Sequence, residues 1–282
     1  MTLLPWKPPY DQQWIFDFLR ARAVTGIETL GEGQYTRSFS LADHRGLINV
    51  VPDEAAQGLR VSLSAGLLPV AEECFARVAR LFDLDCDPQQ VAQVLGPLAS
   101  GRPGLRLPGS LDAFEQAVRA VLGQLVSVAM AAKLTAKVVA AYGEPLADAP
   151  GYYLFPEPQA LAVADPLALK ATGMSLRRAE ALIHLAQAAI DGQLPLVAPD
   201  DIDAGMKQLQ TLPGIGRWTA SYFALRGWQA KDIFLPDDYL IKQRFPGMTP
   251  AAIARYARRW QPMRSYALLH IWYTDDWIPA AE

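Results

Sequence analysis

The sequence predicts an α+β fold in which an N-terminal antiparallel β-sheet with helices is followed by an all-helical region. Three observations support this prediction. Residues 24–65 are rich in strand patterns, residues 101–110 form a Gly/Pro-rich connector, and the chain after residue 112 consists of short apolar-periodic segments with helix caps. At 282 residues the chain is too long for one small core, so we expect two or three packed units.

The strand prediction rests on alternation. In residues 58–66, Leu59, Val61 and Leu63 alternate with polar residues, which is the period of a half-buried strand. Residues 38–51 are typical of two strands joined by a turn at 43–46. Helical patterns flank this sheet at residues 11–23 and 68–82.

Helix signals dominate the rest of the chain. Asp112 and Glu115 are spaced as a capping box that opens a helical segment over residues 113–143. Many later segments begin with Ser, Asp, Thr or Pro and end at Gly. The helices are expected within 165–172, 175–192, 200–212, 217–228, 236–245, 249–260 and 264–274. We therefore divide the chain into an α+β domain (1–111), a helical domain (112–230) and a C-terminal helical domain (231–282).

Composition narrows the class of protein. About half of the residues are apolar and a fifth are charged, as in ordinary globular proteins. No apolar run approaches the ~18 residues of a membrane span, and the first residues do not resemble a signal peptide. Cys74 and Cys86 are the only cysteines, which excludes a four-cysteine metal or iron–sulfur site and predicts a reducing, cytoplasmic location. His44, His184 and His270 are too scattered to be ligand pairs.

The charge is unevenly distributed. The net charge of −3 disfavours a nucleic-acid partner, yet residues 203–264 contain ten Lys/Arg against four acids, whereas residues 1–112 contain ten against thirteen. On charge alone, a solvated helix face explains the basic excess as well as a nucleic-acid surface does.

The segment LPGIGRWTA, residues 212–220, lies inside the basic region. Pro213 ends the preceding helix, and Gly214 and Gly216 allow positive φ and the close approach of another backbone. A new helix then begins near Arg217, and its first amides can bind a phosphate oxygen. The pattern is a helix–hairpin–helix, and its plainer interpretation is an inert turn between two helices.

Several features together resemble the helix–hairpin–helix DNA glycosylases. They are the hairpin, Asp238 about twenty residues after it, and LGQLVS at 122–127. With residues 102–138, 174–186, the chain end 266–277 and the β-rich first domain, the resemblance is closest to the bacterial members that remove alkylated bases. It implies excision of 3-methyladenine, 7-methylguanine and related bases from double-stranded DNA by a monomeric enzyme that leaves an abasic site.

The resemblance selects Asp238 as the catalytic group. A carboxylate beside C1′ stabilises the positive charge that develops there as the glycosidic bond breaks, or it orients the attacking water. By the residues alone, Asp237 or Asp238 is equally able to cap the helix near Tyr239, and the resemblance leaves Asp237 as either the cap or a spectator. In strand-cleaving members a lysine occupies the position of Trp218, so this chain is expected to be monofunctional.

The resemblance also assigns a base pocket. It places Trp218, Tyr222, Tyr239 and Trp272 there, with Phe18 added from the first domain. Trp218 and Tyr222 share a helix face, although such a pair more commonly packs in a core. Aromatic faces attract the positive charge of alkylated purines by about 0.5–2 kcal/mol per contact.

The remaining expectations concern DNA. An apolar wedge fills the gap left by an extruded base, and Leu125 beside Gln124 matches the wedge loop, although an ordinary leucine packs in the core. Gly214, Gly216, Arg217 and Thr219 would contact the backbone. No cofactor is required, but the hairpin carbonyls of Gln210, Leu212 and Ile215 match those that hold a monovalent cation in the family.

Two alternatives stay open. A glycosylase for oxidised or mismatched bases is disfavoured because the lysine and the cluster cysteines are missing. A DNA-binding module without catalysis is disfavoured because Asp238 and the aromatic set are present.

Overall fold

A computed structural model describes residues 1–279. Five strands form one antiparallel sheet in the order β1-β5-β4-β3-β2. The strands are β1 (Thr2–Pro5), β2 (Glu28–Gly31), β3 (Gln34–Leu41), β4 (His44–Asp53) and β5 (Gly58–Leu63). The rest of the described chain is helical or loop, which confirms the predicted α+β class.

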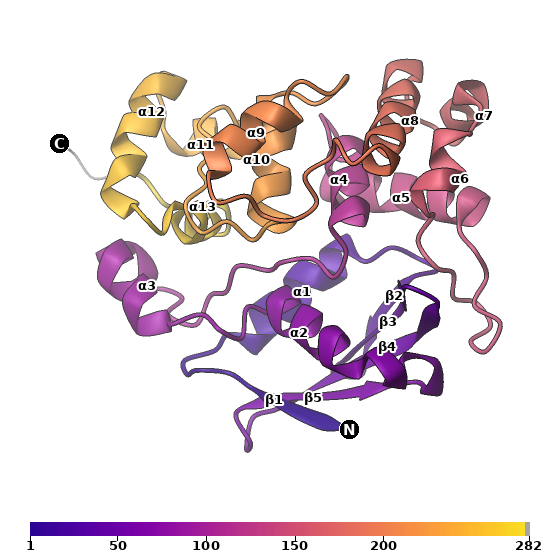
Figure 1. Ribbon diagram of the computed structural model, residues 1–282. Coiled ribbons are helices and arrows are strands. Elements are labelled where there is room, and N and C mark those ends of the chain that lie inside the picture. The colour runs from indigo at the N-terminus through magenta and orange to yellow at the C-terminus, as the bar shows by residue number, and fades with distance from the viewer. Residues whose placement is uncertain (280–282) are drawn as a thin grey trace.

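The helices form a second layer over the sheet (Figure 1). The first-domain helices are α1 (Gln12–Arg22), η1 (Ala65–Val70), α2 (Ala71–Leu81), α3 (Pro88–Leu95) and η2 (Gly96–Ala99). The others are α4 (Ala113–Leu122), α5 (Val128–Tyr142), α6 (Pro158–Ala162), α7 (Pro166–Ala171), α8 (Leu176–Ile190), α9 (Ile202–Leu209), α10 (Arg217–Arg226), α11 (Tyr239–Arg244), α12 (Pro250–Tyr256), η3 (Ala257–Trp260) and α13 (Arg264–Trp272).

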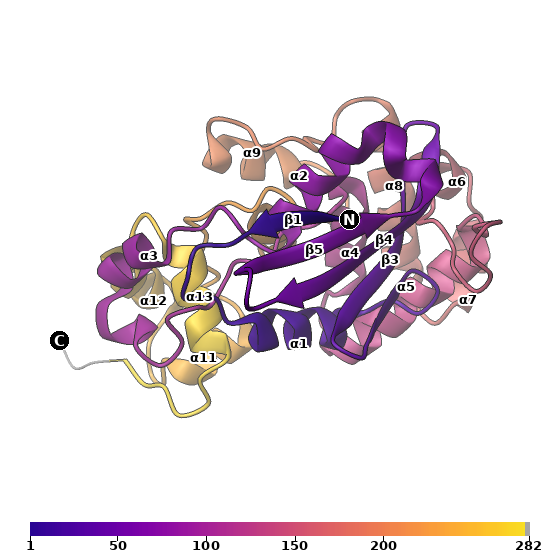
Figure 2. The same ribbon diagram turned by 90° about the horizontal axis from the view of Figure 1, so that it is seen from below.

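Contacts join the two layers into one core. Viewed from the sheet side, α1 runs beside α5, and α3 lies beside α12 and α13 (Figure 2). Helix α1 contacts α5, and α3 with η2 contacts η3 and α13. One cluster of buried apolar residues therefore extends from the sheet, through α1 and α2, to the helices at the C-terminal end.

Three local predictions need correction. The β3–β4 turn lies at Ala42 and Asp43, with Leu41 paired to His44, because Ala42 adopts the left-handed conformation that a tight hairpin needs. Strand β1 was not predicted, since its four residues do not alternate. Residues 113–143 form two helices, because α4 ends at Leu122 and Ser127 caps a new helix.

The capping box at the start of α4 is only half formed. Asp112 is the N-cap and accepts a hydrogen bond from the Glu115 amide at 2.7 Å. The Glu115 carboxylate does not accept the hydrogen bond from the Asp112 amide that would complete the box. It binds Arg37 at 2.7 Å and Arg119 at 3.1 Å, because two buried guanidinium groups attract it more strongly than a backbone amide does.

The Gly/Pro-rich connector is buried between the layers rather than exposed. Leu105, Arg106 and Leu107 are each at most 2% exposed. The Arg106 guanidinium binds the carbonyls of Lys7 at 2.6 Å and Pro9 at 2.8 Å. These charge-assisted hydrogen bonds fix the connector against the start of the chain, although the buried Nε of Arg106 has no partner among the described residues.

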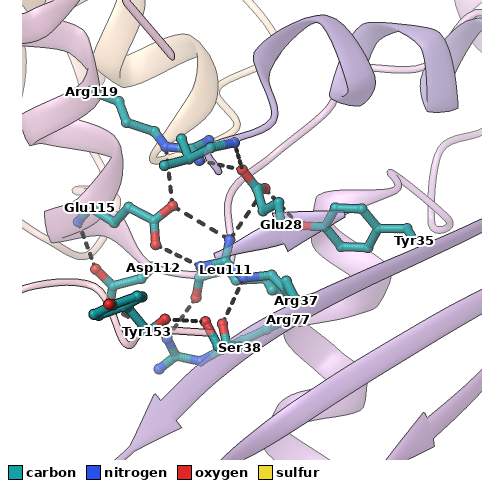
Figure 3. A network of polar contacts seen from close by, with 11 residues as sticks. Glu28, Tyr35, Arg37, Ser38, Arg77, Leu111, Asp112, Glu115, Arg119 and Tyr153 are labelled. Carbon is teal, nitrogen blue, oxygen red and sulfur yellow. Dashed lines mark hydrogen bonds and ion pairs between the residues drawn. The ribbon is translucent and has the colours of Figure 1, made fainter. Parts of the chain in front are cut away.

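A buried ion-pair network joins the sheet to α4 (Figure 3). Glu28 on β2 binds Arg119 at 2.5 Å and lies 3.6 Å from Arg37 on β3. Tyr35 donates a hydrogen bond to Glu28 at 2.8 Å. Burial alone would raise the pKa of Glu28, but Arg119 and Arg37 outweigh burial and lower it to about 2. The sheet and α4 are therefore held together by two carboxylates and two guanidinium groups.

We predict that Arg37→Met lowers the free energy of unfolding by about 3–5 kcal/mol, because it leaves two buried carboxylates with one cation. Urea denaturation at pH 7 measures the loss. Arg45→Met is the control: its ion pair with Glu144 is solvent-exposed and is worth at most about 1 kcal/mol. Equal losses in the two variants would contradict the prediction.

The same network predicts acid sensitivity. The folded-state pKa of Glu28, about 2, lies below its ordinary value of 4.5, so its stabilisation is complete above pH 4.5 and is lost as the pH falls toward 2. Glu28→Gln should flatten the decline of stability between these pH values.

Candidate functional site

A cavity of about 1190 Å³ opens between the first helices of the helical region and its C-terminal helices. Its lining comes from α1, the α4–α5 loop, α5, the hairpin, α10, α11 and the end of α13. Of the residues predicted to form the site, it brings together Gln124, Leu125, Gly214, Gly216, Trp218, Thr219, Tyr222, Asp238, Tyr239 and Trp272.

Asp238 is fixed at the head of α11 by four N–H donors. Its Oδ1 accepts from the amides of Leu240 (3.0 Å) and Ile241 (3.2 Å) and from the Trp272 indole (3.0 Å). Its Oδ2 accepts from the Trp218 indole at 3.1 Å. Oδ1 is thus the more fully bonded oxygen, and Oδ2 keeps lone-pair capacity toward the cavity.

A single aspartate fills both roles, that of the helix cap and that of the cavity carboxylate. Asp238 itself is the N-cap of α11, whereas Asp237 forms an ion pair with Arg217. One carboxylate therefore serves as a cap and lines the cavity, because a short helix beginning at the cavity wall presents its N-cap side chain there. Arg217 does not line the cavity, and its side chain is 64% exposed.

The aromatic residues form a stacked wall. Trp218 and Tyr222 stack with ring centroids 5.1 Å apart and planes 7° from parallel. Trp218 and Trp272 hold the two oxygens of Asp238 from different helices. Tyr239 is 69% exposed and lies at the rim. The wall offers flat apolar surface, and its two indole N–H groups are committed to Asp238, which suits stacking on a planar ring.

Phe18 does not line this cavity. It is 3% exposed, and its ring lies under the guanidinium groups of Arg22 at 3.7 Å and Arg226 at 4.8 Å. Those arginines cover it because α1 presents the next turn, at Arg22, to the cavity. Tyr273 lines the cavity and was missed, although it directly follows Trp272.

The α4–α5 loop projects a leucine into solvent. Leu125 is fully exposed and has φ of +55°, a strained conformation for a leucine. The neighbouring Gln124 amide donates to the Gly214 carbonyl and to Thr219 Oγ1, each at 2.9 Å. Gln124 therefore ties the loop to the hairpin, and the exposure of Leu125 excludes its core interpretation.

The two hairpin glycines differ in backbone conformation and in surroundings. Gly214 has φ of +81°, and a Cβ there would lie 2.4 Å from the Ala181 Cβ on α8. The group that approaches Gly214 closely is thus the protein's own Ala181 side chain. Gly216 has φ of −90° and does not use the positive φ that glycine allows, and a Cβ there would meet only open space.

The start of α10 is open to a ligand. Gly216 is the N-cap, and no side chain caps the helix. Ala220 is the first residue whose amide reaches back, to Gly216, so the amides of residues 217–219 lack intrahelical acceptors. Thr219 is 4% exposed and its hydroxyl accepts from Gln124, so its side chain is not available to a backbone phosphate.

Three arginines that the sequence did not single out also line the cavity. Arg22 comes from α1, Arg119 from α4 and Arg226 from α10. Arg226 follows Trp218 and Tyr222 at the same four-residue interval, and that spacing was the available signal. Burial alone would raise the pKa of Tyr222, but the charges of Arg22 and Arg226 outweigh it and lower that pKa.

The hairpin carbonyls are uncharged oxygen donors on one short loop. The Leu212 carbonyl accepts the Ile215 amide at 3.1 Å and retains a second lone pair. Within residues 1–279, no group of three or more His, Cys, Asp or Glu side chains is arranged to hold a metal ion. The donor set at the hairpin suits a hard monovalent cation better than a transition metal.

Two family matches cover most of the chain. Residues 1–112 match the AlkA N-terminal domain, and residues 118–265 match the HhH-GPD superfamily base excision DNA repair protein. No helix in the described part of the chain is both long and apolar enough to cross a membrane.

Comparisons with individual proteins and solved structures agree with the family matches. The chain is 65% identical to DNA-3-methyladenine glycosylase 2 of Escherichia coli over 279 residues, which is 99% of each chain. It resembles the structure of the 3-methyladenine DNA-glycosylase from Archaeoglobus fulgidus with a TM-score of 0.82, covering 96% of this chain and 97% of that one at 20% identity. The fold also matches the Clostridium acetobutylicum 8-oxoguanine glycosylase/lyase in complex with double-stranded DNA, with a TM-score of 0.71, 18% identity, and coverage of 88% and 87%.

The hairpin glycines give a matched pair of variants. Gly214→Ala should lower the melting temperature, because it combines a positive φ with a clash against Ala181. Gly216→Ala should leave it within about a degree or two, because the added methyl meets open space and the backbone is ordinary. Thermal unfolding followed by circular dichroism checks both, and a reversed order would show that the hairpin is packed differently.

Proposed function

The chain belongs to the HhH-GPD superfamily of base excision DNA repair proteins, and from this premise we propose that it is a monofunctional glycosylase that releases alkylated bases from double-stranded DNA. The observation that carries the proposal is Asp238, fixed by four N–H donors in a cavity lined with aromatic rings. Glycosidic bond hydrolysis on 3-methyladenine and 7-methylguanine is the reaction, and an abasic site is the product.

The geometry suits charge stabilisation at C1′. The glycosidic bond breaks heterolytically, its electron pair leaves with the base, and the sugar becomes an oxocarbenium ion. Asp238 Oδ2, which keeps capacity to accept, stabilises that charge, and water then adds at C1′ with loss of a proton. Four donors hold the carboxylate in place before the reaction, so little reorganisation is needed.

The wall explains a broad choice of lesions. The Trp218 and Tyr222 rings present stacking surface, and their positions do not impose a hydrogen-bond pattern on the base. A cationic alkylated purine gains stacking and cation–π attraction from such a wall. Alkylation also weakens the glycosidic bond, so modest assistance is sufficient.

The monofunctional assignment rests on Trp218. A Schiff base needs an unprotonated amine that is desolvated beside C1′. In this chain the position beside Asp238 is occupied by an indole that donates to that carboxylate. Lys242 lines the cavity but is exposed and lies one helical turn beyond Asp238 on α11. Glycosylases for oxidised bases that use the lysine are therefore disfavoured.

The proposed DNA contacts involve the α4–α5 loop, the hairpin and the start of α10. Leu125 is the wedge that fills the gap left by the extruded base, and the open amides at the start of α10 bind a backbone phosphate. The carbonyls of Gln210, Leu212 and Ile215 hold a monovalent cation that adds positive field beside that phosphate. The enzyme works as a monomer in the bacterial cytoplasm, and its chemistry needs no cofactor.

The catalytic assignment is tested by Asp238→Asn. This variant keeps most of the hydrogen-bonding shape but loses the anion, so release of methylated bases should fall by at least about a hundredfold. Chromatography of bases released from methylated duplex DNA measures it. Equal release by the variant and the wild type would remove Asp238 from catalysis and would favour a binding module in which this carboxylate is only a cap.

Whether the enzyme cuts the DNA strand tests the monofunctional assignment. The wild type should leave alkali-labile abasic sites and intact strands, and borohydride should trap no protein–DNA adduct. If an adduct forms, Lys242→Met identifies whether the exposed lysine of α11 is the nucleophile.

The wedge is tested by Leu125→Ala. The side chain is fully exposed, so folding should be unchanged while affinity for abasic duplex DNA falls by about tenfold. Val163→Ala, an exposed apolar residue on another part of the helical region, is the matched control. A Leu125→Ala variant that binds abasic DNA as tightly as the wild type would rule out the wedge.

A further inference from the structure

Helix α10 presents one continuous face to the catalytic cavity. Trp218, Tyr222 and Arg226 are spaced four residues apart, and all three line the cavity. At 1.5 Å per residue, Trp218 and Arg226 are separated by about 12 Å along the helix axis. Trp218 donates to Asp238, so the negative charge of Asp238 lies at one end of this face and the positive charge of Arg226 at the other.

The positive end holds two cations without carboxylate partners among residues 1–279. Arg226 is 4% exposed and donates to the carbonyls of Pro108 at 2.6 Å and Gly109 at 2.9 Å. Arg22 donates to the Phe18 carbonyl at 3.2 Å, and its buried Nε has no acceptor. Both guanidinium groups lie over the Phe18 ring. Arg22 also faces the hydroxyls of Tyr222 and Tyr273, and Arg226 faces that of Tyr222. Carbonyls, hydroxyls and a ring are uncharged partners, so both positive charges stay in place.

The other charges around the cavity do not cancel this polarity. Arg119 is neutralised by Glu28 and Glu115 at 2.5 and 3.1 Å. Asp237 is paired with Arg217, and Lys242 is exposed, so solvent screens both. Arg226, which is buried, Arg22, which is partly exposed, and Asp238 therefore dominate the field inside the cavity. The lowered pKa of Tyr222, which lies between the two ends, is consistent with that field.

We propose that Arg22 and Arg226 make the base end of the cavity electropositive, so that the cavity drives positive charge from an alkylated base toward its sugar. The inference rests on the proposed function. A 7-methylguanine base carries one positive charge before cleavage. When the C1′–N9 bond breaks, its electron pair moves to N9, the base leaves neutral, and the positive charge passes to the sugar beside Asp238.

The electric field in the cavity acts on both the base and the sugar as the positive charge passes from one to the other. Near the arginines the cationic base is destabilised, and that repulsion is relieved as the base becomes neutral. Near Asp238 the developing sugar cation is stabilised. Binding energy from stacking and from the DNA backbone holds the base in place against the repulsion, which is the condition for strain to speed a reaction.

A neutral lesion such as hypoxanthine distinguishes this electrostatic mechanism from one in which the arginines only contact the base. Its glycosidic bond breaks to give an anionic base, which takes a proton from solvent afterwards. The arginines do not repel the neutral base before cleavage, but they stabilise the anion that forms. The same two residues thus speed both reactions while weakening the binding of the cationic lesion alone.

The experiment compares Arg22→Met with the wild type in single-turnover kinetics on duplexes containing 7-methylguanine or hypoxanthine. At saturating enzyme, we expect the rate on both lesions to fall by about tenfold. For 7-methylguanine, the enzyme concentration that gives half the maximal rate should also fall, because repulsion of the bound cation is removed. For hypoxanthine it should stay the same or rise.

Two controls separate charge from shape. Arg22→Lys retains the positive charge and should preserve most of the wild-type behaviour on both lesions. Arg20→Met removes an exposed charge from the same helix and should change neither quantity, because its side chain is 47% exposed. Thermal unfolding of each variant checks that it is folded.

Some outcomes overturn the inference without touching the proposed function. If Arg22→Met weakens binding of both lesions alike, or if Arg22→Lys fails as Arg22→Met does, Arg22 acts through hydrogen bonding or shape. If neither variant alters either lesion, the field is irrelevant. Failure of the proposed function would instead appear as equal base release by Asp238→Asn and the wild type.

Discussion

The structure depends on a buried set of two carboxylates and two guanidinium groups that joins its two layers. Glu28 and Arg37 belong to the sheet, whereas Glu115 and Arg119 belong to α4 (Figure 3). Ion pairs inside a protein cost desolvation, and they are stable only when each partner is satisfied in a definite geometry. That requirement fixes the position of α4 against the sheet more narrowly than apolar packing alone does. The first domain thereby positions the helix that leads to the site.

The position of α4 carries through to the DNA-facing loops. The helix ends at Leu122, and the next residues place Leu125 in solvent while the Gln124 amide binds the hairpin. Gly214 allows the hairpin to lie against Ala181 of α8 at a separation that no side chain fits. Leu125, the proposed wedge, and the hairpin proposed to bind a phosphate are thus set relative to each other by two hydrogen bonds and one glycine. A rigid arrangement of this kind reduces the ordering needed when DNA binds.

Helix α10 links recognition to chemistry. Its N-terminus has no side-chain cap and is the proposed phosphate site, its first turns carry Trp218 and Tyr222 of the aromatic wall, and its last turn carries Arg226. One rigid element therefore sets the distances between the DNA backbone, the base and the charges around it. Such preorganisation is effective because the groups need not move as charge develops in the transition state.

The class of fold, most helices and much of the cavity lining could be predicted from the sequence, although Phe18 does not line the cavity and Tyr273 was missed. Period-two alternation, caps and glycines act locally, so they identified β5, α4, α10 and the hairpin without reference to the rest of the chain. The aromatic residues, Leu125 and Asp238 were proposed through the family resemblance, which combines motifs from several parts of the chain. Only the tertiary structure decided which aspartate caps α11, that Phe18 lies behind Arg22, and that Arg22, Arg119 and Arg226 face the cavity. Those outcomes depend on contacts between segments far apart in the chain, where burial and charge pairing outweigh local preference, as when Glu115 leaves its capping box for Arg37.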